Sequence, residues 1–436
     1  MPEGAMTKAL ILGGYGLIGA ACLRALRDAG VQVVGLGRSA TAAARVDPDG
    51  DWLFADMARM TVADWQDALA GVDVVVNAAG ALQDSGRDDL AGVHSTAPER
   101  LVTALEGSGV RVIQISAVGV SAQADTAFYR TKARGDAAVR GYDGPWVILH
   151  PGLVLASAAY GGTALLRAAA ALPGIVPQVY PRTRIQTVAM ADLTQAVILC
   201  AQGAIPSGTE ADLVEPEAHS LPRITRHLRR WLGLPPARLS VPMPAPLLSL
   251  IGRGADALAW LGWRSPLRST ALRVLATDVT GDPGPWAAAG GPPCRSLADT
   301  LRSLPATVQD RWFARLWPLL PLSIAVLSLF WLTSGAVGLW QWAAAAEVLT
   351  ARGTSPGVAL AAVVGGGLAD VALGLAILWR RWARAACVGM AILATAYLLG
   401  GTILTPDLWS DPLGPFTKIL PAILLPLMTA AMLEDR

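Results

Sequence analysis

Residues 8–19 read KALILGGYGLIG, a short apolar run that enters a glycine-rich turn, and a helical stretch, 20–29, follows at once. In a strand–turn–helix unit, Gly13 permits the tight turn, Gly16 lets the backbone approach a pyrophosphate, and Gly19 lets helix and strand pack closely. The helix N-terminus then faces the phosphates. The stretch therefore predicts a doubly wound parallel α/β sheet of the Rossmann type. The residues expected at the phosphates are Gly13, Tyr15, Gly16, Leu17, Ile18 and Gly19.

The next apolar run, 31–36, predicts the second strand and ends in Gly37, Arg38 and Ser39. No acidic residue stands where an adenine-ribose 2′-hydroxyl would be held. A guanidinium accepts a 2′-phosphate in a bidentate fork, whereas a carboxylate repels it. Arg38 therefore favours NADP(H) over NAD(H), and an ordinary solvated loop arginine is the alternative interpretation.

Three further strands are predicted. Residues 52–56 form the third, after which Asp56 and Met57 would flank the adenine. Residues 72–76 form a continuous apolar fourth strand, as a parallel sheet buried on both faces requires. The fifth strand, 112–116, ends in Ser116. The cofactor-binding residues expected after the fourth strand are Asn77, Ala78, Ala79 and Gly80.

These motifs resemble the short-chain dehydrogenase/reductase family in its extended or atypical branches, which are similar to NAD-dependent epimerases and dehydratases. The resemblance covers roughly the first half of the chain, and its motifs come in the family's order. They are GGYGLIG at 13–19, NAAG at 77–80, the fifth strand with its terminal serine, FYRTK at 128–132, HPGLV at 150–154 and RIQTVAMADL at 184–193.

The resemblance implies a serine that orients a carbonyl, a tyrosine that transfers the proton, and a lysine four residues after the tyrosine. Ser116 and Lys132 match the serine and the lysine. Because positions i and i+4 share one helix face, Lys132 identifies position 128 as the place of the proton donor. That residue is Phe128, and Tyr129 points about 100° away from it.

Three interpretations of this departure stay open. Tyr129 serves as the proton donor from the i+3 position, water or a substrate group supplies the proton, or the domain binds its nucleotide without turning it over. Ser116 also has a plain structural interpretation as a strand-end hydroxyl bonded to a loop. His150 and Pro151 close the sixth strand beside the expected nicotinamide. His150 is either a proton donor, since its pKa lies near neutrality, or a hydrogen-bonded group that holds the catalytic residues in place without contacting the substrate.

Composition limits the remaining possibilities. The chain has 436 residues, of which 53% are hydrophobic and 16% charged, so it is too long and too apolar for one soluble domain. The net charge of +2 indicates no nucleic-acid partner. The four cysteines form no C-x-x-C pair, and the other histidines lack metal-ligand spacing, so we expect neither a disulfide framework nor a metal site.

Residues 156–305 alternate helical runs with Pro- and Gly-rich connections, which predicts the remainder of the first domain as a substrate-covering lobe on the 1–155 core. Two stretches in it have the composition of membrane-surface segments. One is the basic amphipathic run 221–232. The other, 247–263, is rich in Leu, Ala and Trp. A packed helix with a solvated arginine face is an equally good interpretation of the first.

Residues 306–436 contain four apolar segments, predicted as a four-helix transmembrane bundle, and a span needs about 20 residues. The last segment is the shortest and is interrupted by Pro421 and Pro426. Arginines precede the first segment, separate the second from the third and follow the fourth, and the other two connections carry little positive charge. The positive-inside rule then places both termini in the cytoplasm, in a multi-pass inner-membrane protein. The predicted spans lie near 317–339, 358–379, 385–404 and 417–433.

This half resembles the DoxX-like family of small four-helix membrane proteins, through FWLTSG at 330–335, GLAD at 367–370 and DLWSDPLGP at 407–415. The resemblance implies quinone-coupled redox chemistry. Asp370 in the second span marks a proton or ligand site or a structural anchor between helices. We therefore expect a membrane-anchored NADP(H)-binding oxidoreductase for a hydrophobic carbonyl, quinone or isoprenoid-like substrate. The alternative is a nucleotide-binding sensor or scaffold with a membrane protein partner.

Overall fold

The computed structural model describes residues 7–81, 89–263 and 265–433. The chain divides into two compact units. The first holds the described residues of 1–255 and 266–314, and the second holds those of 256–265 and 315–436.

The first unit is built on a seven-stranded sheet whose strand order is β11-β6-β5-β4-β1-β2-β3, and every neighbouring pair is parallel. Leu12 is level with Leu36 and with Asn77, so the carboxyl ends of three central strands lie at one edge. The strands are β1 (Lys8–Leu12), β2 (Gln32–Gly37), β3 (Asp51–Phe54), β4 (Val74–Asn77), β5 (Arg111–Ile115), β6 (Trp146–Pro151) and β11 (Thr209–Leu213).

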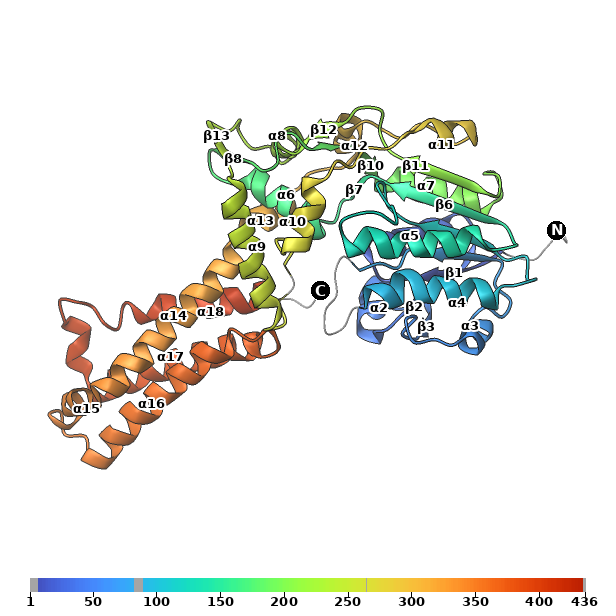
Figure 1. The fold of residues 1–436 in the computed structure, drawn as a ribbon. Helices are drawn as coiled ribbons and strands as arrows, with labels where there is room; N and C mark the ends of the chain where they lie inside the picture. Colours follow the sequence, from blue (N-terminus) through green and yellow to red (C-terminus); the bar gives the residue numbers. More distant parts are fainter. Residues whose placement is uncertain (1–6, 82–88, 264, 434–436) are drawn as a thin grey trace. The chain divides into compact units, whose positions relative to one another are not determined.

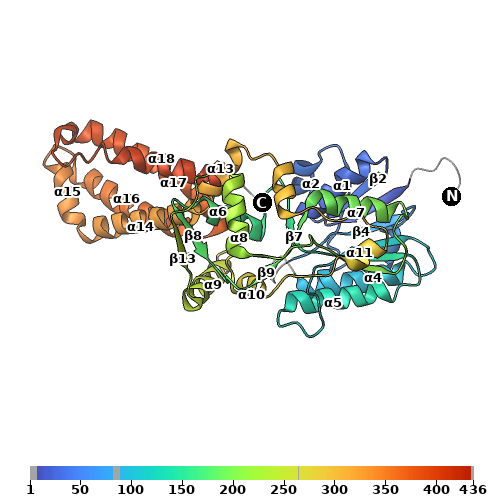
Figure 2. The same cartoon turned by 90° about the horizontal axis from the view of Figure 1, so that it is seen from above.

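Helices cover both faces of this sheet (Figures 1 and 2). Figure 2 shows α1 (Leu17–Asp28) and α7 (Met190–Ala201) on one side, with α4 (Ala97–Ala104) and α5 (Ala127–Arg140) on the other. Ile11 belongs to one buried core and Leu10 to the other, because successive strand residues face opposite ways. Doubly covered strands explain the continuous apolar runs, and the predicted Rossmann-type α/β fold is confirmed. The smaller helices here are α2 (Ala40–Val46), α3 (Val62–Ala68) and the π-helix η1 (Gly92–Thr96).

Several element boundaries near the predicted site differ from expectation by one to three residues, and Ser116 lies just beyond the end of β5. Helix α1 begins at Leu17 rather than at residue 20, because Gly16 is already its extended N-cap residue. Strand β3 ends at Phe54, so Asp56 and Met57 lie beyond it. The first shift places Leu17, Ile18 and Gly19 in the first turn of α1, where backbone N–H groups lack partners within the helix. The second places Asp56 and Met57 in the connection after β3.

Two-stranded sheets and helices of residues 153–255 and 266–314 complete the first unit, around a core that includes Leu166, Ile224 and Leu297, and the last residues of α9 and α13 belong to the second unit. Glu215 organises this region: its buried carboxylate accepts hydrogen bonds from the backbone N–H of Thr187 and of Leu297. The sheet pairs are β7 (Leu153–Leu155) with β10 (Thr187–Ala189), β8 (Ile175–Gln178) with β13 (Leu239–Pro242), and β9 (Arg184–Ile185) with β12 (His219–Ser220). The helices are α6 (Gly161–Ala171), α8 (Leu221–Trp231), α9 (Ala245–Ala259), α10 (Ser269–Ala276), α11 (Gly284–Ala288) and α12 (Leu297–Ser303), followed by α13 (Val308–Leu316).

The second unit contains three helices that are long and apolar enough to cross a membrane. They are α14 (Leu319–Trp340), α16 (Pro356–Ala376) and α17 (Arg380–Leu404), and α15 (Trp342–Thr350) and the 3-10 turn η2 (Pro406–Ser410) lie in the connections. The fourth predicted segment forms α18 (Ile419–Met432), whose 14 residues fall short of the about 20 that a perpendicular span needs. The four predicted apolar segments are thus three long helices and one short one in the described part of the chain. Pro426 inside α18 removes one hydrogen bond within that helix.

Small residues let α14 and α16 pack closely. A Cβ on Gly335 would come within 2.6 Å of the Gly367 carbonyl oxygen, so only glycine fits this crossing. Ser328 donates a 2.8 Å hydrogen bond to the Gly374 carbonyl across the same contact. Close packing through small residues and cross-helix hydrogen bonds is typical of helices in a bilayer.

Candidate functional site

The glycine turn after β1 has no room for side chains. Gly13 has a positive φ of 70°, and a Cβ there would lie 2.8 Å from the Cα of Ala79. A Cβ on Gly19 would collide with the carbonyl of Gly13. Helix α1 begins directly after this turn and has no acidic residue in its first turn. The cradle therefore fits a pyrophosphate at a helix N-terminus, held by backbone N–H groups.

Tyr15 connects the glycine turn to the end of β2. Its hydroxyl accepts a 3.1 Å hydrogen bond from the backbone N–H of Arg38, and its ring occupies the space that a Cβ on Gly37 would need. The side chain of Arg38 is exposed. The residue proposed for 2′-phosphate recognition thus stands at the carboxyl end of β2, next to the glycine turn.

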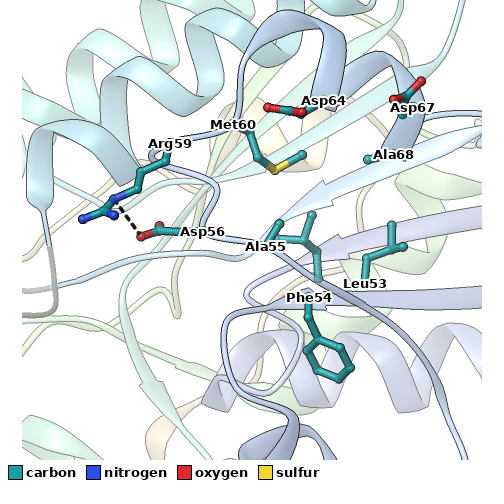
Figure 3. Close-up of a pocket in the computed structure, with 10 residues that line it drawn as sticks. Leu53, Phe54, Ala55, Asp56, Arg59, Met60, Asp64, Asp67 and Ala68 are labelled. Carbon is teal, nitrogen blue, oxygen red and sulfur yellow. Dashed lines mark ion pairs between the residues drawn. The ribbon is translucent and has the colours of Figure 1, made fainter.

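A shallow cavity of about 470 Å³ lies beyond the end of β3, beside the residues expected at the adenine (Figure 3). Asp56 lies at its rim, where its carboxylate forms a 3.7 Å ion pair with Arg59. Asp64 and Asp67 also line the cavity, so its rim is mostly acidic. Met57, by contrast, is buried in the core beneath the sheet edge.

The turn after β4 is fixed by two buried side chains. The Asn77 side-chain oxygen accepts a 3.2 Å hydrogen bond from the backbone N–H of Ala79. The His94 Nε2 accepts one from the N–H of Ala81 at 3.1 Å, while its Nδ1 lies 3.0 Å from the Thr131 hydroxyl. Since Nε2 accepts here, we assign the Nδ1–H tautomer. Burial and the charge of Lys132 lower the pKa of His94 to about 3, so it is neutral.

Phe128 occupies the place that the i+4 spacing assigns to the proton donor. The Lys132 ammonium lies 5.9 Å from the centre of the Phe128 ring, so the two share one face of α5. Lys132 is buried and donates to the Ile115 carbonyl at 3.1 Å. Tyr129 is also buried and points towards Gly119, and burial raises the pKa of its phenol.

A hydrogen-bond network of buried polar side chains links β4, β5 and α5 near Phe128 and Lys132. The amide of Asn77 donates to the Gln114 side chain at 2.8 Å, and Gln114 donates to Asp136 at 3.3 Å. Ser116 donates its hydroxyl hydrogen to Asp136 at 2.5 Å. Asp136 is completely buried, four residues after Lys132 on α5. The predicted catalytic serine is therefore bonded to a carboxylate that the sequence analysis did not single out.

His150 of β6 extends this network to the edge strand β11. Its Nε2 lies 3.5 Å from Asp136 and 3.5 Å from Glu210, and its Nδ1 lies 3.2 Å from Asp212. Burial alone would lower the pKa of His150, but the Asp136 carboxylate 3.5 Å from Nε2, the hydrogen bond with Asp212 and the Glu210 charge raise it to about 9. Although burial opposes it, the nearby His150, the hydrogen bond from Ser116 and the Lys132 charge lower the pKa of Asp136. His150 is thus an imidazolium enclosed by carboxylates at neutral pH.

We expect this arrangement to make stability fall in mild alkali. The folded-state pKa of about 9 lies above the ordinary 6.5, so the stabilisation is fully present below pH 6.5 and is lost as the pH rises through about 9. It amounts to about 3 kcal/mol at most. The measurement is the apparent Tm of the detergent-solubilised chain from pH 6 to 10. A His150→Gln variant should show a flatter profile over this range, and an equally steep profile would contradict the assignment.

The second unit carries one polar cluster inside its apolar helices. Asp370 of α16 is buried, with an exposed fraction of 4%, and accepts hydrogen bonds from Ser334 of α14 at 2.9 Å and from Tyr397 of α17 at 2.7 Å. The residue predicted as a ligand site or an anchor thus joins three helices. Among the described residues, no group of three or more His, Cys, Asp and Glu side chains is arranged to hold a metal ion.

Asp136 and His94 are the site residues that sequence reasoning missed. Asp136 follows Lys132 by four residues, so the shared helix face was a usable signal. His94 had no local signal, because its partners at Ala81 and Thr131 come from separate parts of the chain. The predicted residues lie at or just after the carboxyl ends of β1 to β6, or on α5.

Two family models match the sequence. Residues 13–193 match a family described as NAD(P)H-binding, and residues 328–427 match the DoxX-like family. No curated protein matches this chain in sequence.

Solved structures match the fold over most of the chain. The Bordetella bronchiseptica enzyme WbmG in complex with NAD is 19% identical, with a TM-score of 0.52, over 71% of this chain and 95% of WbmG. TunA, an NAD-dependent NDP-hexosamine 5,6-dehydratase, is 16% identical, with a TM-score of 0.50, over 70% and 97%. The UDP-glucose 4-epimerase of Thermotoga maritima is 15% identical, with a TM-score of 0.51, over 70% and 98%. At these identities the likeness concerns the fold.

Proposed function

We propose that this chain, which joins an NAD(P)-binding domain with structural neighbours in the NAD-dependent epimerase/dehydratase family to a DoxX-like domain, is a membrane-anchored oxidoreductase. It would use NADP(H) on a hydrophobic carbonyl, quinone or isoprenoid-like compound. The observation that carries the proposal is the glycine cradle, with the buried Lys132 nearby, in a chain that also has three membrane-length helices.

The chain's own residues have separable roles in this proposal. The glycine turn holds the pyrophosphate, Arg38 the 2′-phosphate and Lys132 the nicotinamide ribose, while the bound cofactor supplies the hydride. Ser116 would turn its hydroxyl hydrogen from Asp136 to the substrate oxygen, and Tyr129 would supply the proton. Because burial raises the pKa of Tyr129, its phenol stays protonated and acts as a donor rather than a base. This favours reduction of a carbonyl over oxidation of an alcohol.

We propose the inner membrane as the location, with both termini in the cytoplasm. The two connections that carry little positive charge are joined by a 2.7 Å ion pair between Arg352 and Asp407. This contact supports a topology in which both connections lie on one side of the bilayer. The arginines at the other ends of the helices would then face the cytoplasm.

We expect Arg38→Ala to weaken NADPH binding about 10- to 100-fold and to leave NADH binding nearly unchanged. A charge-assisted hydrogen bond to phosphate contributes about 1.5–3 kcal/mol, and only NADPH carries the 2′-phosphate. Calorimetric titration of the detergent-solubilised chain with each nucleotide measures both effects. Arg24→Ala, on the exposed side of α1, is the matched control. Equal losses for the two nucleotides would contradict 2′-phosphate recognition by Arg38.

The catalytic part of the proposal is tested by NADPH oxidation in lipid nanodiscs, with quinones, long-chain aldehydes and UDP-sugars as candidate acceptors. We expect Tyr129→Phe to lower kcat by about 10²- to 10⁴-fold with an unchanged Kd for NADPH, the range for loss of a general acid. Tyr160→Phe, at a 59% exposed tyrosine, should have no effect. Phe128→Tyr should increase turnover, because it places a phenol on the Lys132 face of α5.

A nucleotide-binding sensor or scaffold is the second candidate function, and Phe128 at the donor position favours it. In that case the membrane helices would bind a protein partner. Tight NADPH binding without turnover of any acceptor, by the parent chain and by Phe128→Tyr alike, would support the scaffold. Turnover that depends on Tyr129 would exclude it.

A further inference from the structure

Helix α9 has two apolar faces, and only one of them is buried. Leu248, Gly252 and Ala255, spaced by four and three residues, form the buried face. Leu247 and Leu250 lie on the other face, with exposed fractions of 42% and 67%. An amphipathic helix of a soluble domain would carry polar residues at these positions.

The strand that leads into α9 continues this exposed apolar character. Leu239 and Val241 of β13 are 63% and 38% exposed, and alternate residues of a strand share one face. Only Met243 and Pro244 separate β13 from α9. Contiguous exposed apolar surface marks a site of interaction, and these residues lie on consecutive elements of the chain.

Basic residues predominate before and within α9, and Asp256 near its end is the first acidic residue after Glu217. Residues 218–255 contain six arginines and no aspartate or glutamate. Arg229 is buried and donates to three backbone carbonyls, so it serves the fold. The side chains of Arg226, Arg230, Arg238 and Arg253 are exposed. Exposed leucines flanked by arginines match the boundary between headgroups and acyl chains in an anionic bilayer.

We propose that β13 and the first turns of α9 form a second membrane contact, the β13–α9 surface, defined by Leu239, Val241, Leu247 and Leu250. The leucines and the valine enter the acyl boundary, and the arginines bind the phosphates of anionic phospholipids. A second copy of the chain is a poorer occupant, because a two-fold contact would bring the same arginines together. The inference rests on the proposed membrane placement of the three long helices.

This contact would hold the helices of the substrate-covering region at the lipid surface. A substrate dissolved in the bilayer would then reach the first unit without crossing water. The β13–α9 surface thus narrows the proposed substrate class to lipid-soluble compounds.

The test is a nitroxide label on Leu250→Cys in the full chain, placed in nanodiscs of phosphatidylcholine with phosphatidylglycerol. The four native cysteines are buried, so the label attaches to the new one. We expect the label to relax faster with oxygen, which dissolves in acyl chains, than with a water-soluble nickel chelate. Labels on Glu106→Cys, exposed after α4, and on Leu368→Cys, 58% exposed on α16, provide the water and lipid references.

The reference labels at positions 106 and 368 distinguish failure of the β13–α9 contact from failure of the membrane anchor. If the label at 368 is in lipid while the nickel chelate relaxes the label at 250 as strongly as the label at 106, the β13–α9 contact is wrong and the membrane anchor stands. If the label at 250 is shielded from both reagents, a protein covers the surface and the lipid occupant is overturned. If the label at 368 lies in water, both the anchor and this inference fail. Leaving out phosphatidylglycerol should reduce the oxygen preference at 250, and an unchanged preference would overturn the role of the arginines.

Discussion

Replacing Gly19 with alanine is expected to abolish measurable NADPH binding, which we place at a loss of at least about 100-fold, or about 2.7 kcal/mol. A Cβ at this position would collide with the carbonyl carbon and oxygen of Gly13, which are backbone atoms and do not move independently of the turn. The helix must therefore separate from the strand, and its N-terminus leaves the phosphate position. Calorimetric titration of the solubilised chain with NADPH measures this effect.

The same substitution elsewhere provides the control. A Cβ on Gly162 of α6 would meet no heavy atom within 4 Å, and its φ lies outside the left-handed region. Gly162→Ala should therefore bind NADPH with the parent affinity. Because Gly19→Ala also strains the fold, circular dichroism and the apparent Tm accompany the titration. A folded Gly19→Ala chain that binds NADPH as well as the parent chain would rule out the glycine cradle as the nucleotide site.

Local sequence signals predicted the secondary structure correctly where it depends on residues close together in the sequence. The apolar runs of β1 and β4 predict buried parallel strands, and the spacing from Phe128 to Lys132 predicts one helix face. The third strand was predicted to end two residues too late, because its register with β2 stops at Phe54 and Ala55 adds one further hydrogen bond, to the Gly37 carbonyl. Element ends depend on hydrogen-bond partners, which lie in other strands.

The carboxylate network could not be predicted in this way. Asp136, His150 and Asp212 come from a helix and two strands that meet only after β6 pairs with β11. Composition could not predict the length of α18 either. Its apolar residues suit a membrane span, but the helix contains only 14 residues. Composition indicates where a segment prefers to lie, whereas tertiary contacts decide how much of it is helical.

Asp136→Asn is expected to destabilise the first unit by about 3–5 kcal/mol, the usual effect of removing one partner from a buried ion pair. The substitution keeps the shape and the hydrogen bond with Ser116, but it removes the buried negative charge beside Lys132 and leaves His150 with Asp212 and Glu210 only. Asp143→Asn, at an exposed residue beyond the end of α5, should change stability by about 0.5 kcal/mol or less.

A pH profile distinguishes the loss of charge from a packing defect. Asp136 makes the largest favourable contribution to the raised pKa of His150, so Asp136→Asn should lower that pKa. The alkaline loss of stability would then shift to lower pH and shrink, in addition to the overall fall in Tm. Chemical denaturation of the solubilised chain at pH 6.5 and pH 9.5 gives both quantities. An Asp136→Asn variant that is as stable as the parent at both values would mean that the carboxylate neither pairs with His150 nor supports Ser116 and Lys132.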